Sequence, residues 1–294
     1  MATSRISAAY RFAQPAGAAA LLGESPAVDD RTGHVWWVDI AGRQLNRTHK
    51  ESGETEAWPS PEEPGFVVLL RDGTPAIGME TGIFAFEPES SGFRKLIDQP
   101  RGGHRFNDAT VGADGTLFVS TMTRDVAAGE AAIFRVDRSA ALVPVTDGLT
   151  IPNGMVADLK RERFYFSDSE PRTRRIWVAD LDPTDDTIGT PALFASMEGL
   201  PGRPDGAAVD ASGRYWIAAV DGAALYVYTL SGEREFEVPL PVRYPTKLAF
   251  LGTNRDSLVV TSKADGQDGG KLLFVTFPHG TIRGTAQHRW RFGG

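Results

Sequence analysis

The sequence predicts an all-β fold: a six-bladed β-propeller with four-stranded blades, formed by residues 1–294 as a single domain. Six similar units follow one another along the chain, and within them apolar residues alternate with period two. Glycine and proline, at 32 and 19 residues, supply the frequent turns that short strands need. A β-sandwich does not require six equal units, so the propeller is favoured.

Each predicted unit begins with a short, mostly apolar block. The blocks are Glu24–Asp29, Gly65–Leu70, Asn107–Gly112, Asn153–Asp158, Asp205–Asp210 and Thr246–Leu251, and their starts are 41, 42, 46, 52 and 41 residues apart. A turn and a second strand rich in β-branched and aromatic residues follow each block. This spacing is that of a propeller blade. The segment around Ile6–Phe12 is predicted to add the outer strand of the last blade and so close the ring.

Charge and composition restrict the partners. The net charge is −7 and no run of lysine or arginine occurs, so neither nucleic acid nor an anionic membrane is an expected partner. The absence of cysteine excludes disulfides, thiolate metal sites and cysteine nucleophiles. Arg11 and Pro15 interrupt the N-terminal apolar residues, and no 18-residue apolar run exists, which favours a cytoplasmic protein. We expect a monomer or a weak homo-oligomer.

The opening residues of the six blocks are predicted to form a ring at one mouth of the central channel, because the first strand of each blade lies nearest the axis. Four of them carry a carboxylate or a carboxamide: Glu24, Asn107, Asn153 and Asp205. Carboxylates buried together are costly without a positive charge between them, and oxygen donors suit Ca²⁺, Mg²⁺ or Mn²⁺. The pairs Asn-Asp, Asn-Gly and Asp-Gly are also ordinary turn signals, but four such polar residues in a shared register favour a metal site over unrelated turns.

Other motifs narrow the chemistry. Arg105 is either a solvated loop cation or a side chain that reaches over the mouth to hold a substrate oxygen. The sequence contains no G-x-S-x-G nucleophile elbow, no P-loop, no G-x-G-x-x-G and no H-E-x-x-H. A serine hydrolase, a nucleotide-binding enzyme and a zinc protease of these types are therefore not predicted.

These segments resemble the SMP-30/gluconolactonase/luciferin-regenerating-enzyme family, which contains regucalcin. The likeness runs from about Leu22 to Ser262. It rests on LGESP at Leu22–Pro26, WWVDI at Trp36–Ile40, RFND at Arg105–Asp108, STM at Ser120–Met122, GLTIPNG at Gly148–Gly154, SDS at Ser167–Ser169, PDGAAVDASGRYWIA at Pro204–Ala218 and LPVRYPTKLAF at Leu240–Phe250. The combination and order of these motifs make the resemblance specific.

The resemblance implies a six-bladed propeller that hydrolyses sugar lactones with one divalent metal ion (Ca, Mg, Mn, Zn or Fe). Glu24, Asn153 and Asp205 match the family's protein metal ligands. Arg105 and Asn107 match residues that face the substrate, and Asp125 stands in the place of an acidic substrate-binding loop residue. The chain departs from the family at Ser120, where glycine is usual, and at Gly112–Ala113, which affects the expected choice of substrate more than the metal site.

The expected reaction is hydrolysis of a gluconolactone-, xylonolactone- or arabinonolactone-type substrate to the aldonic acid. Asp205 is the candidate general base and also a metal ligand, two roles that compete because coordination lowers its basicity. A hydroxide on the ion is the alternative base. Two rival functions stay open: a metal-assisted hydrolase of other esters or phosphotriesters, and a non-enzymatic propeller that binds a partner or calcium.

Overall fold

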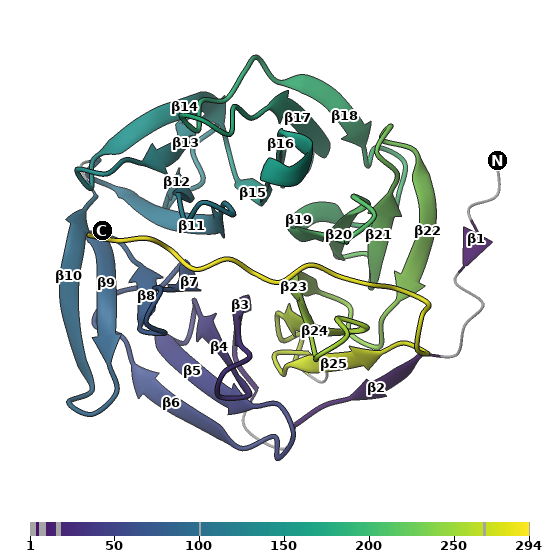
Figure 1. Cartoon of the computed structure of the whole chain (residues 1–294), viewed down its shortest axis with the longest axis horizontal. Coiled ribbons are helices and arrows are strands. Elements are labelled where there is room, and N and C mark those ends of the chain that lie inside the picture. The colour runs from purple at the N-terminus through teal and green to yellow at the C-terminus, as the bar shows by residue number, and fades with distance from the viewer. Residues whose placement is uncertain (1–3, 6–9, 16–18, 100, 267–268, 294) are drawn as a thin grey trace.

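The computed structural model describes residues 4–5, 10–15, 19–99, 101–266 and 269–293. Within this part of the chain, six β-sheets are arranged around a central axis (Figure 1). Each blade begins with its innermost strand, and successive strands pair antiparallel outward. The predicted six-bladed propeller is confirmed.

The first three blades follow the predicted units closely. Blade one comprises β3 (Gly23–Asp29), β4 (His34–Asp39), β5 (Gln44–His49) and β6 (Thr55–Pro59). Blade two comprises β7 (Phe66–Leu69), β8 (Pro75–Gly78), β9 (Gly82–Glu87) and β10 (Gly92–Asp98). Blade three comprises β11 (His104–Val111), β12 (Leu117–Thr123), β13 (Ala131–Val136) and β14 (Leu142–Leu149).

The next two blades complete the sequential part of the ring. Blade four comprises β15 (Pro152–Asp158), β16 (Arg163–Asp168), β17 (Arg175–Asp180) and β18 (Ala192–Ser196), with the short 3-10 helix η1 (Leu159–Arg161) between β15 and β16. Blade five comprises β19 (Arg203–Val209), β20 (Tyr215–Val220), β21 (Ala224–Tyr228) and β22 (Arg234–Pro239). In the described residues, no helix has the length and apolar character needed to cross a membrane.

Blade six closes the ring with strands from both ends of the chain. It comprises β23 (Pro245–Leu251), β24 (Ser257–Ser262), β25 (Leu273–Thr276) and the N-terminal β2 (Arg11–Ala13), which pairs antiparallel with β25. The predicted outer strand is therefore confirmed at its C-terminal end, while residues 6–9 of that segment lie outside the described residues. β1 (Ser4–Arg5) pairs parallel with β22, so blade five gains a fifth strand that the sequence did not predict. This strand covers the outer edge of the blade, where β22 offers backbone groups for pairing.

Aromatic side chains fill the layers between blades. The ring of Trp216, in blade five, meets Phe250, in blade six, edge to face at 5.6 Å between centroids. Tyr165, in blade four, stacks on Tyr215, in blade five, at 5.0 Å. These large buried surfaces hold neighbouring blades at fixed angles and so fix the positions of the inner strands.

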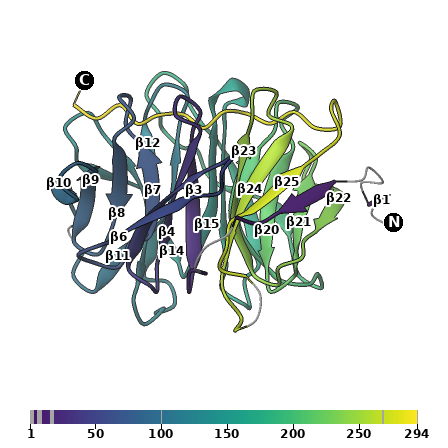
Figure 2. The same cartoon turned by 90° about the horizontal axis from the view of Figure 1, so that it is seen from below.

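A C-terminal segment, residues 281–292, crosses one face of the propeller, and we call it the C-terminal strap (Figures 1 and 2). Thr285 Oγ1 donates a hydrogen bond to the carbonyl oxygen of Val209 at 2.7 Å. The amide of Trp290 donates to the carbonyl oxygen of Leu69, and that of Arg291 to Gly115, both at 2.8 Å. The strap therefore closes the mouth of the channel at which the inner strands end, opposite the mouth at which they begin.

Candidate functional site

A β-bulge interrupts the innermost strand in five of the six described blades. Between consecutive paired positions, two residues of the inner strand oppose one of its neighbour, so each of these five inner strands contains one extra residue. The affected intervals are Glu24/Ala27, Phe106/Ala109, Asn153/Val156, Pro204/Ala207 and Pro245/Leu248. A bulge changes the direction of nearby side chains. The predicted ring positions lie at or inside these bulges, except Gly65 in blade two.

Two aspartates at the ends of second strands fix the backbone before two of the candidate ligands. In blade one, the carboxylate of Asp39 accepts hydrogen bonds from both amides of Leu21–Leu22 at 2.9 Å. In blade four, the carboxylate of Asp168 accepts from both amides of Thr150–Ile151 at 2.9 Å. Glu24 lies two residues after Leu22, and Asn153 lies two residues after Ile151. The same local clamp therefore sets the height of a predicted ligand in two separate blades.

The two asparagines meet across the boundary between blades three and four. Nδ2 of Asn107 donates to Oδ1 of Asn153 and to the carbonyl oxygen of Pro152, both at 3.0 Å. Nδ2 of Asn153 donates to Oγ of Ser169 at 2.8 Å, which leaves its Oδ1 directed toward Asn107. The amide oxygen of Asn153 is thus held in the channel mouth by contacts on both sides.

Glu24 and Asp205 form the acidic part of the site. Burial raises the pKa of Glu24 to about 7, against the effect of Lys247, and the nearby charge of Asp108 raises it further. Burial is also the main reason that the pKa of Asp205 lies well above its ordinary value, and the charge of Glu24 adds to it. The charge of Glu24 therefore acts on Asp205, although the two residues come from blades one and five.

Arg105 lies beside this cluster in a fixed position. Its Nε pairs with Oε1 of Glu63 at 2.9 Å, and its Nη1 donates to Oδ1 of Asn107 at 2.9 Å. The side chain of Arg105 is only 11% exposed, so the solvated-loop interpretation is wrong. Glu63, which sequence reasoning missed, precedes the first strand of blade two and carries no sequence motif that would have revealed it.

Asp125 is exposed, in the loop that follows β12. Thr123 pairs with His104 at the beginning of β11, so this loop leaves the sheet at the same mouth as the candidate ligands. Asp125 therefore lies at the same mouth as the candidate ligands. Its role toward a substrate stays a prediction.

A buried ion pair below the ring is the main feature that the sequence analysis missed. Nζ of Lys247 pairs with Oδ1 of Asp108 and donates to the carbonyl oxygen of Ala109 at 3.0 Å. Both residues occupy the second position of their blocks, directly after Asn107 and Thr246. Simple strand alternation directs the first and second positions to opposite faces of a blade, but Asp108 and Lys247 lie inside bulges, where the side-chain direction changes. Comparing second positions across the six blocks would have revealed the opposite charges.

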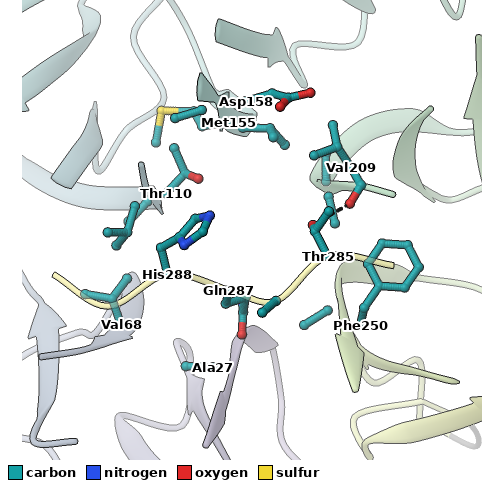
Figure 3. A pocket seen from close by; sticks show the side chains of 18 of the residues that line it. Ala27, Val68, Thr110, Met155, Asp158, Val209, Phe250, Thr285, Gln287 and His288 are labelled. Atoms are coloured by element: carbon teal, nitrogen blue, oxygen red, sulfur yellow. Dashed lines mark hydrogen bonds between the residues drawn. The ribbon is translucent and has the colours of Figure 1, made fainter. Parts of the chain in front are cut away.

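A separate cavity of about 360 Å³ occupies the channel between Lys247 and the C-terminal strap. Its wall is largely alanine, valine and leucine, with Met155 and Phe250, and the strap contributes Gln287 and His288 (Figure 3). None of the predicted site residues lines this cavity. The candidate site and the apolar cavity are therefore distinct parts of one channel.

A divalent cation fits the donor set at the mouth. Two buried carboxylates with raised pKa values need either protons or a shared cation, and the amide oxygen of Asn153 adds a neutral oxygen ligand. Among the described residues, no three His, Cys, Asp or Glu side chains gather closely enough to hold an ion. A site with Glu24, Asn153 and Asp205 instead combines two carboxylates with an amide, a set that hard cations accept.

Known proteins share both the sequence and the fold. The chain is 32% identical over 255 residues to a putative sugar lactone lactonase of Rhizobium meliloti, with 85% of each chain covered. It is 31% identical over 250 residues to the pentonolactonase XacC of Haloferax volcanii, with 84% of each covered. Among solved structures, the calcium-binding protein regucalcin of Agrobacterium tumefaciens superposes with a TM-score of 0.86 at 24% identity, covering 94% of this chain and 95% of that one, which supports the fold alone.

The family assignment rests on most of the chain. Residues 22–264 match the family described as SMP-30/Gluconolactonase/LRE-like region. The matched segment begins just before Glu24 in blade one and ends just after β24 in blade six, so it contains every predicted ligand. The chain therefore belongs to the SMP-30/gluconolactonase/LRE-like family.

Proposed function

We propose that this protein hydrolyses sugar lactones to aldonic acids with the help of one divalent metal ion. The observation that carries the proposal is the electrostatic effect of buried Glu24 on buried Asp205, although the two come from different blades. The fixed amide oxygen of Asn153, which accepts a hydrogen bond from Asn107, supports it. The names of the relatives support the substrate class, since they include a sugar lactone lactonase, a pentonolactonase and a 6-deoxy-6-sulfogluconolactonase.

Glu24, Asn153 and Asp205 would hold the ion, which supplies Lewis-acid chemistry: it polarises a carbonyl and makes water more acidic. Asp205 is the proposed general base. It takes a proton from water as the water oxygen attacks the lactone carbonyl carbon. It then gives this proton to the ring oxygen when the bond between the carbonyl carbon and the ring oxygen breaks. The product is the open-chain hydroxy acid, which contains the atoms of the lactone and of one water molecule.

Arg105 and Asn107 are the proposed contacts to the sugar. Glu63 holds Arg105 so that its guanidinium lies beside Asn107, where donors for ring hydroxyls or lactone oxygens are needed. Asp125 is proposed to accept hydrogen bonds from hydroxyl groups at the outer edge of the site. Charge-assisted hydrogen bonds of this kind orient a small polar substrate.

A lactone panel tests the proposal. Protein stripped with chelator, with metal loss verified, is assayed by a pH indicator on pentono- and hexonolactones before and after addition of each of Ca²⁺, Mg²⁺, Mn²⁺, Zn²⁺ and Fe²⁺. We expect lactone hydrolysis that disappears on stripping and returns with at least one ion. Full activity in the stripped protein would remove the metal from the mechanism, and bound metal without turnover on any lactone would indicate a binding protein.

A further inference from the structure

The side chain of Lys247 crosses the channel directly beneath the candidate site. Lys247 lies on β23 in blade six and its partner Asp108 on β11 in blade three, and these blades stand opposite each other in the ring (Figure 1). The two side chains are only 7% and 4% exposed. The ion pair therefore spans the axis of the propeller and is shielded from water.

Contacts from two further blades fix this ion pair. In blade five, Gly206 leaves room for the lysine stem, since a Cβ there would lie 2.3 Å from Cγ of Lys247. In blade four, the amide of Met155 donates to Oδ2 of Asp108 at 3.1 Å. Oγ of Ser120 accepts a hydrogen bond from the amide of Asp108 at 2.9 Å. Ser120, which stands where the family usually has glycine, therefore helps to position Asp108. The ammonium thus has one defined position below the ring.

The charged groups that act on Glu24 and Asp205 can be counted: they are Asp108, Lys247, Arg105 and Arg203, together with the effect of Glu24 on Asp205. Arg105 is paired with Glu63, and Arg203 with Asp221, so these four contribute no net charge. Three carboxylates are left, those of Glu24, Asp108 and Asp205, with one ammonium, that of Lys247. With all groups ionised, the remainder is two negative charges, which one divalent cation balances.

We propose that Lys247 is a built-in counter-cation that neutralises Asp108 and so limits the site to one divalent ion held by Glu24, Asn153 and Asp205. This inference rests on the cation site proposed above. Stability alone does not account for such a pair, because buried ion pairs contribute little compared with apolar side chains of similar volume. Lys247 and Asp108 also lie close enough to change the pKa values of both Glu24 and Asp205, as a counter-charge for the site must.

Calorimetric titration of the metal-stripped protein with Mn²⁺ and Ca²⁺ tests the proposal without an activity measurement. For Lys247→Met, which frees the Asp108 carboxylate, we expect binding at least about tenfold tighter than in the wild type, since the site gains a full negative charge. A second bound ion would support the proposal equally. The double variant Lys247→Met/Asp108→Asn restores the charge balance, and we expect one ion with an affinity within about threefold of the wild type.

Lys95→Met is the matched control, because Lys95 forms an exposed pair with Asp98 on the outer strand of blade two and should leave metal binding unchanged. Equal stoichiometry and affinity in wild type and Lys247→Met would overturn the proposal, as would an equal gain in the double variant. Asp108→Asn covers the case in which Lys247→Met fails to fold: it leaves the ammonium unpaired and removes one negative charge, so we expect binding at least about tenfold weaker than in the wild type, and unchanged binding would overturn the proposal. Metal binding without lactone hydrolysis would instead contradict the proposed function and leave this inference standing.

Discussion

Nδ2 of Asn107 donates a hydrogen bond to Oδ1 of Asn153 at 3.0 Å, across the boundary between blades three and four. The oxygen that the sequence assigns to a metal ion therefore faces a residue assigned to the substrate. A cation that binds Asn153 would share its amide oxygen with this hydrogen bond, so cation binding and the position of Asn107 are linked. Metal affinity and turnover therefore need separate measurement.

Metal affinity is expected to rise with pH. Burial raises the pKa of Glu24 from its ordinary value of 4.5 to about 7, and that of Asp205 is raised as well. Protons therefore compete with the cation below about pH 7. For each carboxylate that must lose its proton to bind, metal affinity should fall by about tenfold per pH unit below the pKa of that carboxylate. Calorimetry with Mn²⁺ at several pH values between about 5 and 8 measures this.

The same shifts act in the opposite direction on the metal-free protein. A raised pKa means that the folded state keeps a proton that the unfolded chain releases, so stability is highest below pH 4.5 with respect to Glu24 and declines up to about pH 7. Thermal unfolding in chelator should therefore show a Tm that falls across this range, and added metal should recover it above about pH 7. A flat Tm and a pH-independent affinity would contradict the assignment of Glu24 to the site.

Asp205→Asn should lower kcat for lactone hydrolysis by at least about 100-fold, because it removes both a proton acceptor and a charged ligand. Metal affinity should fall in the same variant. Asp98→Asn is the control, since Asp98 lies on the outer strand β10 and pairs only with the exposed Lys95 among the interactions described. Wild-type turnover in Asp205→Asn at saturating metal would exclude Asp205 as the base.

Glu63→Gln should raise KM about tenfold and change kcat by less than about threefold. Its carboxylate holds Nε of Arg105 at 2.9 Å, and without that charge the guanidinium loses its fixed direction toward the substrate. Steady-state kinetics on the best lactone separate the two parameters. Glu56→Gln, which breaks the exposed pair with Arg47, is the comparison and should change neither.

Gly206→Ala should destabilise the protein by about 1–3 kcal/mol through overpacking. The new methyl group would lie 2.3 Å from Cγ of Lys247, so the lysine stem must move and the ion pair with Asp108 must be distorted. Denaturant unfolding measures the loss. Gly189→Ala is the control, because its Cβ would approach no atom closer than 3.5 Å. Equal stability of the two variants would show that the stem of Lys247 adapts freely.

Trp290→Ala should destabilise the fold by about 3 kcal/mol and leave kcat unchanged. Trp290 is 2% exposed and joins the C-terminal strap to blade two through Leu70, at the mouth opposite the candidate site. Thermal unfolding and lactone kinetics on the same preparation check both parts. Leu193→Ala, at a 61% exposed position, gives the baseline for a surface truncation. A large loss of kcat would mean that the two mouths are coupled.

The repeat determined the fold from the sequence alone. Six apolar blocks at blade spacing fixed the number of blades and the direction of the inner strands, because each blade buries its own alternating pattern against its neighbours. The shared first position also placed Glu24, Asn107, Asn153 and Asp205 at one mouth. Residues at equivalent heights of a closed ring must lie near the same axis, so no knowledge of packing was needed.

The tertiary structure alone decided what surrounds those residues. Strand periodicity assigns first- and second-position side chains to opposite faces of a blade. The bulges, which depend on pairing with the adjacent strand, change these directions at Asp108 and Lys247, which pair across the channel. The pairing of Arg105 with Glu63 likewise joins two blades whose contact has no local signal. Asp108 and Lys247 are far apart in the sequence. Their charges compensate each other only because the closed ring brings β11 and β23 to opposite sides of one channel.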